Sequence, residues 1–256
     1  MLADHYAGAP DEVVRELGLG WEWIGETLVL WASQIDVLMF NRALHVGMAE
    51  SATEYELAAI AARFDGEGVP RSFLQLAPGA EPPELESWAH ARGWAPYNRW
   101  VRFARALADP PAAPDSVRVD VIGPDRAEAF ASIVVTAFRM PPVFATWERT
   151  IVGRRGWTHY LASIDGEPVG CAATFSDGDV FWFGRAGTLD AARGRGVQGA
   201  LIARRLADAA AAGATHAIVE TAEDMPDRDA PSFRNQLRFG YELCYRRPNW
   251  LRARPA

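Results

Sequence analysis

The segment that most constrains the fold is LDAARGRGVQGALIARRLADAAAAGATHAIVE, Leu189 to Glu220, where a glycine-rich turn opens a long helix and a buried strand follows. Gly194 and Gly196 have no Cβ, so the backbone N–H groups around them can turn toward one point. The unpaired N–H groups of the helix start and the positive end of its dipole meet at the same place. The segment therefore predicts an anion-binding turn, and the anion has to be identified.

One candidate anion is the pyrophosphate of a dinucleotide, because Gly194, Gly196 and Gly199 spell G-x-G-x-x-G. Glu220 also lies about 20 residues beyond the last glycine, as that fingerprint requires. However, residues 190–193 separate the preceding strand from Gly194, so the tight strand-to-glycine turn is missing. The chain ends at residue 256, too soon after Glu220 for the rest of a doubly wound sheet. The dinucleotide interpretation is therefore disfavoured.

Composition indicates a globular chain of 256 residues, 49% hydrophobic, with ten tryptophans and a net charge of -7. The acidic balance argues against nucleic acid as the partner. Cys171 and Cys244 lie in apolar runs and are expected to be small core residues of a reducing compartment. The sequence has no secretion signal at its start and no apolar run long enough to span a membrane, so we expect a cytoplasmic protein.

The proline-rich segment Asp109–Ser116 predicts a linker between residues 1–108 and 117–256. In the second half, the pattern predicts a strand over 117–122, helices over 124–140 and 142–152, and a hairpin turning at Asp165-Gly166. A third strand covers 180–189, and the loop and a helix from Val197 to Ala212 follow. The half ends with the strand THAIVET, a helix over 232–239 and the strand YELCYR.

The first half repeats part of this order. Strands are expected in VLMFNRALHV, RSFLQLA and WAPYNRWVRFA, with helices over 53–64 and 81–92. Each half also runs from a helix-stopping glycine through an aromatic residue into a strand, which indicates an internal duplication. The first copy has HVGMAESAT in place of the loop, with one glycine and no arginine. We therefore expect only the second copy to bind a phosphate.

These features resemble the GNAT superfamily, the acetyl-CoA-dependent N-acetyltransferases. Their [Q/R]-x-x-G-x-[G/A] loop stands here as Arg193-Gly194-Arg195-Gly196-Val197-Gln198. The resemblance extends over 117–251 in element order and includes the ending Ser232, Asn235, Gly240 and Tyr241. Gln198 departs from the family's small residue, and we expect it to point outward. The fold implied is α/β (α+β): two tandem GNAT-like domains, each a mixed, mostly antiparallel sheet flanked by helices, the first one degenerate.

The resemblance implies that acetyl-CoA is the cosubstrate. No metal is expected, because the five histidines of the sequence show no ligand spacing. The pyrophosphate of acetyl-CoA is expected on the loop, and its pantetheine arm along the preceding strand. The oxyanion of the tetrahedral intermediate is expected on a backbone N–H near Thr188 or Leu189. The implied cofactor-binding residues are Gly187, Thr188, Leu189, Arg193, Gly194, Arg195, Gly196, Val197, Gln198, Gly199 and Asn235.

The catalytic side chains are less well defined by the sequence. Glu220, at the end of THAIVET, is the candidate general base, and a strand-end surface carboxylate is the alternative. Gln236 occupies the position of the family's usual tyrosine acid and cannot deliver a proton. Tyr241 and Tyr245 are candidate substitutes, with core packing as the alternative for each.

The sequence therefore predicts an N-acetyltransferase (an acyltransferase) that acts on a primary amine of an unidentified, small-molecule acceptor. A non-catalytic acyl-CoA-binding sensor, favoured by the missing tyrosine, and a structural tandem protein are the alternatives. Neither nucleic acid nor membrane is an expected partner, and exposed tryptophans would favour a homodimer. The aromatic segment WEWIGETLVLW is expected to be core or a wall facing the other half.

Overall fold

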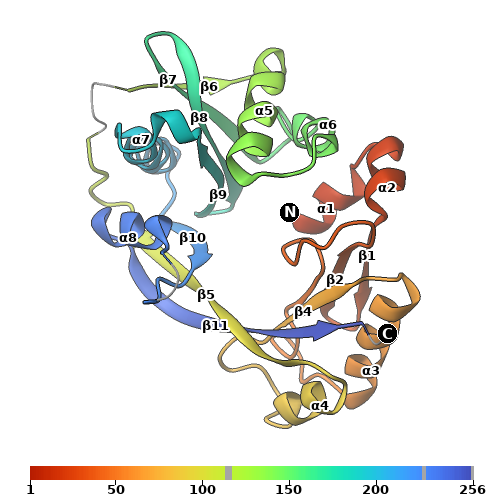
Figure 1. The fold of residues 1–256 in the computed structure, drawn as a ribbon. Coiled ribbons are helices and arrows are strands. Elements are labelled where there is room, and N and C mark those ends of the chain that lie inside the picture. The colour runs from red at the N-terminus through yellow and green to blue at the C-terminus, as the bar shows by residue number, and fades with distance from the viewer. Residues whose placement is uncertain (113–116, 227–228, 255–256) are drawn as a thin grey trace. The chain divides into compact units, whose positions relative to one another are not determined.

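A computed structural model describes residues 1–112, 117–226 and 229–254 of the chain (Figure 1). The chain divides into two compact units: unit 1 comprises Met1–Trp100 and Tyr245–Ala256, and unit 2 comprises Val101–Cys244. Residues 113–116 of the proposed linker Asp109–Ser116 lie outside the described residues. Among the described residues, no helix is both long and apolar enough to cross a membrane.

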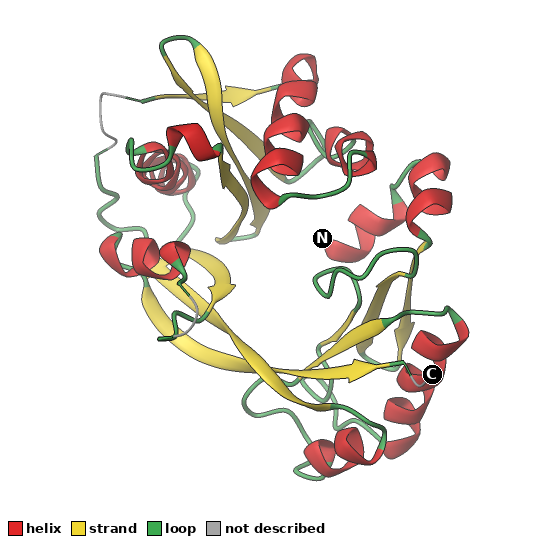
Figure 2. Cartoon of the chain, viewed as in Figure 1, coloured by secondary structure: helices red, strands yellow, loops and turns green. Residues whose placement is uncertain are grey.

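Unit 1 contains a helix pair, a three-stranded meander and two further strand and helix pairs (Figure 2). Its elements are α1 (Leu2–Ala7), α2 (Asp11–Leu17), β1 (Leu19–Ile24), β2 (Thr27–Ala32), β3 (Arg42–Leu44), α3 (Glu54–Gly66), β4 (Arg71–Gln75), α4 (Leu85–Ala91) and the first part of β5 (Ala95–Ala106). The strand order in this unit is β1-β2-β3-β4-β11-β5. The β3–β4 pair is parallel, and the pairs β1–β2, β2–β3 and β4–β11 are antiparallel.

Unit 2 follows the same plan with one additional strand at its start. Its elements are β6 (Arg118–Ile122), η1 (Pro124–Arg126), α5 (Ala127–Phe138), α6 (Val143–Arg149), β7 (Trp157–Ile164), β8 (Glu167–Asp177), β9 (Val180–Thr188), η2 (Asp190–Ala192), α7 (Val197–Ala211), β10 (His216–Ala222), α8 (Pro231–Arg238) and the first residues of β11 (Glu242–Ala253). The strand order is β5-β10-β9-β8-β7-β6. Only β9–β10 is parallel among the pairs β6–β7, β7–β8, β8–β9 and β9–β10.

The order helix pair, meander, helix, strand, helix, strand therefore occurs twice. The sequence predicted part of this order for the first half, without the helix pair and the β1–β2 strands. The final strand of each copy belongs to both units, since the division falls at Trp100/Val101 in β5 and at Cys244/Tyr245 in β11. Each last strand consequently has one part in each unit. The sequence carries no signal for this sharing, because it depends on which strand a long, regular segment pairs with.

Each unit has its own apolar core. In unit 1, α3 and α4 bury residues such as Leu57, Ile60 and Ala89 against Leu74 and Trp250 of the sheet. In unit 2, α5 covers one face of the sheet through Phe130 and Ile133. Helix α7 covers the opposite face, where its fully buried side chains meet those of β7, β8, β9 and β10. This two-sided coverage holds β9, and the loop that follows it, between two helices.

Three expectations need correction. Cys171 is buried, but Cys244 is exposed because it lies on the same side of β11 as the exposed Glu242, two residues earlier. VLMFNRALHV forms a strand only at 42–44, since residues 37–40 form turns. WEWIGETLVLW forms the β1–β2 hairpin, in which Leu28–Trp31 are buried as expected of a core segment, whereas Trp23 is exposed.

Candidate functional site

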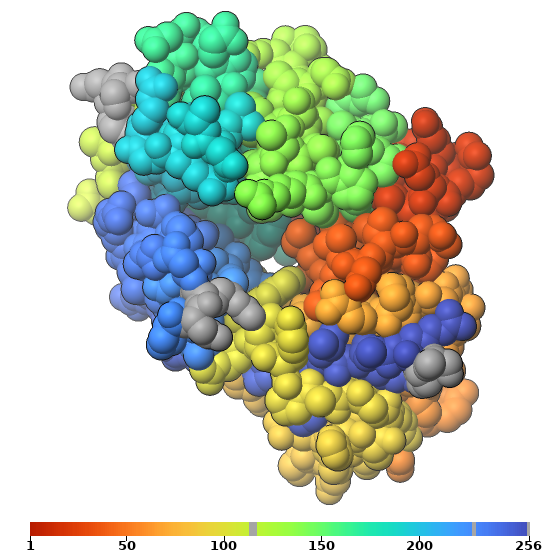
Figure 3. Space-filling model, viewed as in Figure 1, coloured from red at the N-terminus to blue at the C-terminus, as the bar shows by residue number. Residues whose placement is uncertain are grey.

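The loop between β9 and α7 has the backbone conformation that its glycines predict. Gly194 has φ of 74° and Gly196 has φ of 80°, in the left-handed region that glycine adopts without strain. A Cβ added at either position would meet nothing within 4 Å. The glycines therefore allow the backbone to make this turn. They also leave open space beside it, where a ligand can approach the backbone. The cyan segment that contains this turn reaches the surface in Figure 3.

The start of α7 is neither capped nor neutralised by an acidic side chain. Gly196 is the N-cap residue and makes no side-chain cap hydrogen bond, and the first turn of α7 contains no acid. The first N–H groups of an α-helix have no partner within the helix and carry the positive end of its dipole. The loop therefore presents backbone donors and positive potential at one exposed point.

Two arginines add mobile positive charge beside this helix start. Arg193 is 61% exposed and bonds Asp190 at 2.8 Å. Arg195 is 53% exposed and lies 4.0 Å from Asp165. Exposed pairs of this kind are weak, so either guanidinium can exchange its carboxylate for a phosphate at little cost.

The pairing of β9 with its parallel neighbour β10 ends several residues before the loop. The β9–β10 register runs from Val180↔His216 to Phe183↔Val219, and β9 continues to Thr188. Over this last stretch β9 pairs with β8 alone among the described strands. Its other edge therefore offers unpaired backbone groups, which can accept an extended ligand as an added strand would.

A bulge accompanies this separation. Ala173 pairs with Gly184 and Cys171 with Gly187, so β9 has two residues, Arg185 and Ala186, opposite one of β8. Arg185 adopts a φ of 48°, and its side chain bonds the buried Glu148 at 2.8 Å. The bulge turns the end of β9 and fixes which of its N–H groups face the open edge.

The predicted strand residues are distributed between the two edges of β9. Leu189 N–H donates to Val169 O at 2.9 Å, so this group is not available as an oxyanion donor. Because an antiparallel ladder alternates, the backbone groups of Thr188 face the other, open edge. Gly187 lies under the end of α5, where a Cβ would be 2.9 Å from the Ala137 methyl group. Thr188 is therefore the better of the two expected donors.

Glu220 lies where β10 diverges from β9, one residue beyond the last pair, Phe183↔Val219. Its carboxylate accepts a hydrogen bond from Arg102 on β5 at 3.0 Å and is 16% exposed. Glu220 is thus an ion-paired carboxylate rather than a free surface acid. It lies near the point where β9 and β10 separate, which is called the opening below.

The other predicted site residues, Tyr241, Tyr245 and Asn235, lie outside β9, β10 and the loop. Tyr241 is 3% exposed within the core beneath α7, where burial raises the pKa of its hydroxyl. Tyr245 belongs to unit 1 and therefore to a different compact unit from the loop. Asn235 is half-buried on α8, and Gln236 beside it is buried. Glu220, Thr188 and the loop thus all belong to unit 2, whereas Tyr245 belongs to unit 1.

Helix α8 also supports the first turn of α7. A Cβ at Gly199 would lie 3.2 Å from the Phe239 ring, which follows α8. Gln198 is half-buried rather than fully outward, and Val197 is buried in the core. The outward orientation expected for Gln198 is therefore only partly met.

One residue that supports this site was not predicted. Arg205 of α7 is fully buried, donates from Nε to Leu201 O at 3.0 Å, and lies 4.7 Å from the Phe183 ring. Its Nη1 also reaches Ala173 O at 3.4 Å, at the bulge. Its spacing from Leu201 and Ala209 already put Arg205 on the buried face of the helix. Arg205 thus links the helix that carries the loop to the point where β9 separates.

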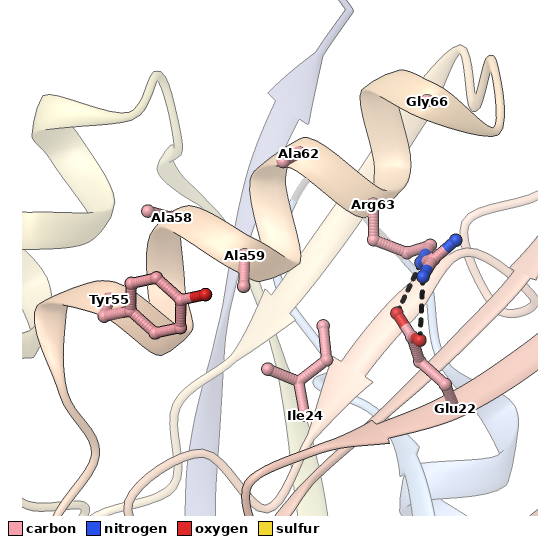
Figure 4. A pocket seen from close by; sticks show the side chains of 8 residues that line it. All are labelled: Glu22, Ile24, Tyr55, Ala58, Ala59, Ala62, Arg63 and Gly66. Atoms are coloured by element: carbon pink, nitrogen blue, oxygen red, sulfur yellow. Dashed lines mark hydrogen bonds and ion pairs between the residues drawn. The ribbon is translucent and has the colours of Figure 1, made fainter.

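A shallow cavity of about 550 Å³ lies elsewhere, in unit 1, between α3 and β1 (Figure 4). Tyr55, Ala59 and Ile24 border it, and the Glu22–Arg63 pair lies at one end. It contains none of the predicted site residues, and two of its charged side chains, Glu22 and Arg63, are paired with each other.

Comparison with known proteins gives the class of fold. No family model and no curated protein matches the chain. A GCN5-related N-acetyltransferase structure from Kribbella flavida covers 98% of this chain and 94% of its own, at 22% identity and a TM-score of 0.61. One from Sphaerobacter thermophilus covers 79% and 67%, at 20% identity and a TM-score of 0.63. The chain has the fold of the GCN5-related N-acetyltransferases.

A tandem GNAT protein from the clavulanic acid biosynthesis pathway is also similar to this chain, with a TM-score of 0.58 at 17% identity. The alignment covers 79% of this chain and 70% of that protein. Together with the repeated element order, this likeness shows the particular form of the fold. It is a tandem arrangement of two GNAT-like units, as the sequence predicts.

Proposed function

We propose that this protein transfers an acetyl group from acetyl-CoA to a primary amine of a small-molecule acceptor. The observation that carries the proposal is the uncapped, arginine-flanked start of α7, directly after the unpaired end of β9. Together these two features provide a diphosphate site and an edge for an extended chain. Acetyl-CoA has both groups, in that order.

The residues of the loop fit the cosubstrate. The pyrophosphate would accept hydrogen bonds from the N–H groups of Gly194–Gly199, with Arg193 and Arg195 balancing its charge. The open space above Gly194 and Gly196 is the room that its oxygens need. The pantetheine arm would pair with the backbone at Gly187 and Thr188, and Asn235 of α8 would contact the cofactor from the side.

The chemistry then requires few side chains. The neutral amine attacks the thioester carbonyl carbon, a C–N bond forms, and the C–S bond breaks with the electron pair on sulfur. The Thr188 N–H would stabilise the oxyanion, a contribution of roughly 3–4 kcal/mol for a well-placed donor. Glu220 would take the amine proton, directly or through water, while Arg102 orients its carboxylate. The coenzyme A thiolate needs no dedicated acid, so Tyr241 and Tyr245 have no required part.

A non-catalytic acyl-CoA-binding protein is the second candidate. It is favoured by the buried Gln236, which stands where the resemblance places a proton donor. The two candidates share the cofactor site and differ in turnover alone.

Two measurements test the proposal in order. A thermal-shift titration compares acetyl-CoA with NAD: a hundredfold excess over Kd adds roughly 2.7 kcal/mol of stability for the ligand that binds. Acetyl-CoA is expected to raise Tm and NAD to leave it unchanged. Mass spectrometry of an amine panel incubated with acetyl-CoA then detects acetylated product. Several products per protein support the enzyme, binding without turnover favours the sensor, and a shift with NAD alone rejects both.

A further inference from the structure

A stripe of aromatic side chains crosses the unit 2 sheet on one face. Trp157 of β7 pairs with Phe175 of β8, which pairs with Trp182 of β9. Directly paired residues project to the same face, and the ring centroids are 5.2 Å apart for Trp157–Phe175 and 6.0 Å apart for Trp157–Trp182. All three residues are half-buried, so the stripe keeps some access to solvent.

The stripe lies on the face opposite α7. Phe183, next to Trp182 in sequence, packs beneath α7 against Leu206 and Tyr241. Because neighbouring strand residues alternate, Trp182 projects to the face that α5 covers.

The Trp182 indole extends along β9 toward the opening. A Cβ added at Gly184 would lie 1.7–2.4 Å from three atoms of the indole ring, so the ring lies directly over the Gly184 backbone. Gly184 is the first β9 residue beyond the last β9–β10 pair, Phe183↔Val219. The indole therefore covers β9 at the point where the two strands separate.

Trp157 is a poorer surface for a ligand because other groups already occupy its faces. The Arg185 guanidinium lies 4.8 Å from its ring centroid, and His159 stacks on it at 5.8 Å. Phe175 meets Trp157 at a steep angle. Trp182, which lies at the opening, is thus a better surface for a ligand than Trp157.

An ion pair completes this edge of the stripe. Ile218 of β10 pairs with Trp182, and Glu220 follows two residues later on the same face. Its carboxylate is bonded to Arg102 at 3.0 Å. A ligand on this face therefore meets an indole on β9 and a carboxylate on the neighbouring strand.

We infer that Trp182 determines acceptor specificity and that the acceptor is a primary amine carried on a flat aromatic skeleton. This inference rests on the proposed function, which brings the acetyl group to the same separation of β9 and β10. A flat apolar ring gains contact area and favourable ring geometry on an indole. The carboxylate of Glu220 attracts the ammonium form of the amine. Polyamines and amino sugars, in contrast, have no flat ring that could stack on the indole.

The test compares amines and two tryptophan variants of the full chain. Initial rates of product formation, followed by mass spectrometry, are measured for phenethylamine, tryptamine, spermidine and glucosamine at saturating acetyl-CoA. The aromatic amines are expected to have kcat/KM values at least about tenfold above the other two. Trp182→Ala should raise KM for the aromatic amines about tenfold or more, with a smaller change in kcat and an unchanged Kd for acetyl-CoA.

Two further variants keep the test interpretable. Trp182→Phe retains a flat ring and should recover most of the loss in KM, while both Trp182 variants keep the wild-type Kd for acetyl-CoA, which a merely structural role of the indole would not predict. Trp23→Ala removes a 52% exposed tryptophan from unit 1 and should change neither KM nor kcat. If glucosamine or spermidine is preferred, or if Trp182→Ala behaves as the wild type, the inference is wrong although the proposed function stands. If no amine is acetylated, the proposed function fails and the inference fails with it.

Discussion

The two units differ most clearly at the equivalent turn between the third strand of the meander and the helix that follows. In unit 1 this turn is closed by the chain itself. Glu81 N–H donates to Gly47 O at 2.8 Å, and Ala52 N–H donates to Glu81 O at 2.9 Å. A Cβ at Gly47 would lie 2.1 Å from Glu81 O. No open space therefore remains above this glycine, in contrast to Gly194 and Gly196.

The helix starts differ in charge as well. In unit 1, Thr53 and Glu56 form a capping box, in which the Glu56 carboxylate accepts from Thr53 N–H and the Thr53 hydroxyl accepts from Glu56 N–H. The first turn of α3 is therefore already satisfied and carries a negative charge. In unit 2, the equivalent start has no cap and two nearby arginines. The same position in the fold is thus capped by the chain's own side chains in unit 1 and lacks such a cap in unit 2, where we propose that an anion binds.

The largest effect is expected from Gly196→Asp, which gives unit 2 a carboxylate at its helix start, as unit 1 already has. Aspartate tolerates positive φ, so the fold should survive, while its charge and side chain fill the phosphate space. Acetyl-CoA affinity should fall more than about a hundredfold, measured by calorimetry. The matched control is Gly213→Asp, since Gly213 has a φ of 84° and equally open surroundings at the other end of α7. Equal losses in both variants would contradict the assignment.

A smaller loss is expected from Arg193→Ala. A charge-assisted hydrogen bond to phosphate contributes about 1.5–3 kcal/mol, so Kd for acetyl-CoA should rise about tenfold to a hundredfold. The loss should shrink at high salt, because the guanidinium is exposed and screened. Arg118→Ala, at another exposed ion pair, should leave Kd unchanged. An unchanged Kd for Arg193→Ala would remove this side chain from the site.

The two units should also respond differently to acid. Burial, with Arg185 nearby, lowers the pKa of His159 to about 3, against an ordinary value near 6.5. The folded state thus resists protonation, and stability is complete above about pH 6.5 and lost as pH falls toward 3. The loss is about 1.4 kcal/mol per pH unit, or about 2 kcal/mol between pH 6.5 and 5. In unit 1, Arg252 lowers the pKa of Asp65, so the stability from this pair is complete above about pH 3.8 and is lost only as the pH falls below that value.

Urea unfolding at pH 7 and pH 5 measures this acid sensitivity. His159→Leu should flatten the dependence, whereas substitution of the exposed His216 by Leu should not. A dependence that survives His159→Leu would assign it to other groups.

The smallest effect is expected from Thr53→Ala in unit 1. Loss of this N-cap should lower the free energy of unfolding by about 1 kcal/mol, measured by urea denaturation. Acetyl-CoA affinity should not change. A change in Kd comparable to that of Arg193→Ala would show that unit 1 takes part in cofactor binding.

The features that were predicted correctly from the sequence are those that a few neighbouring residues determine. Glycine spacing defined the loop and the end of α7, and Asp165-Gly166 defined the β7–β8 turn, where both residues have positive φ. The β1–β2 hairpin was missed although Gly25 marks its turn, because the buried β2 segment TLVLWA does not alternate as a half-buried strand does. The Glu220–Arg102 pair lay beyond sequence reasoning, since 118 residues separate its partners. The bulge at Arg185 likewise depends on how β8 and β9 pair.

The most direct test of the difference between the two turns is hydrogen exchange with and without saturating acetyl-CoA, analysed by mass spectrometry of peptides. The account predicts slower exchange in peptides covering residues 187–200 and no change in peptides covering 45–57. Protection of 45–57, or no protection of 187–200 despite measured binding, would contradict the claim that only the second turn holds the cofactor.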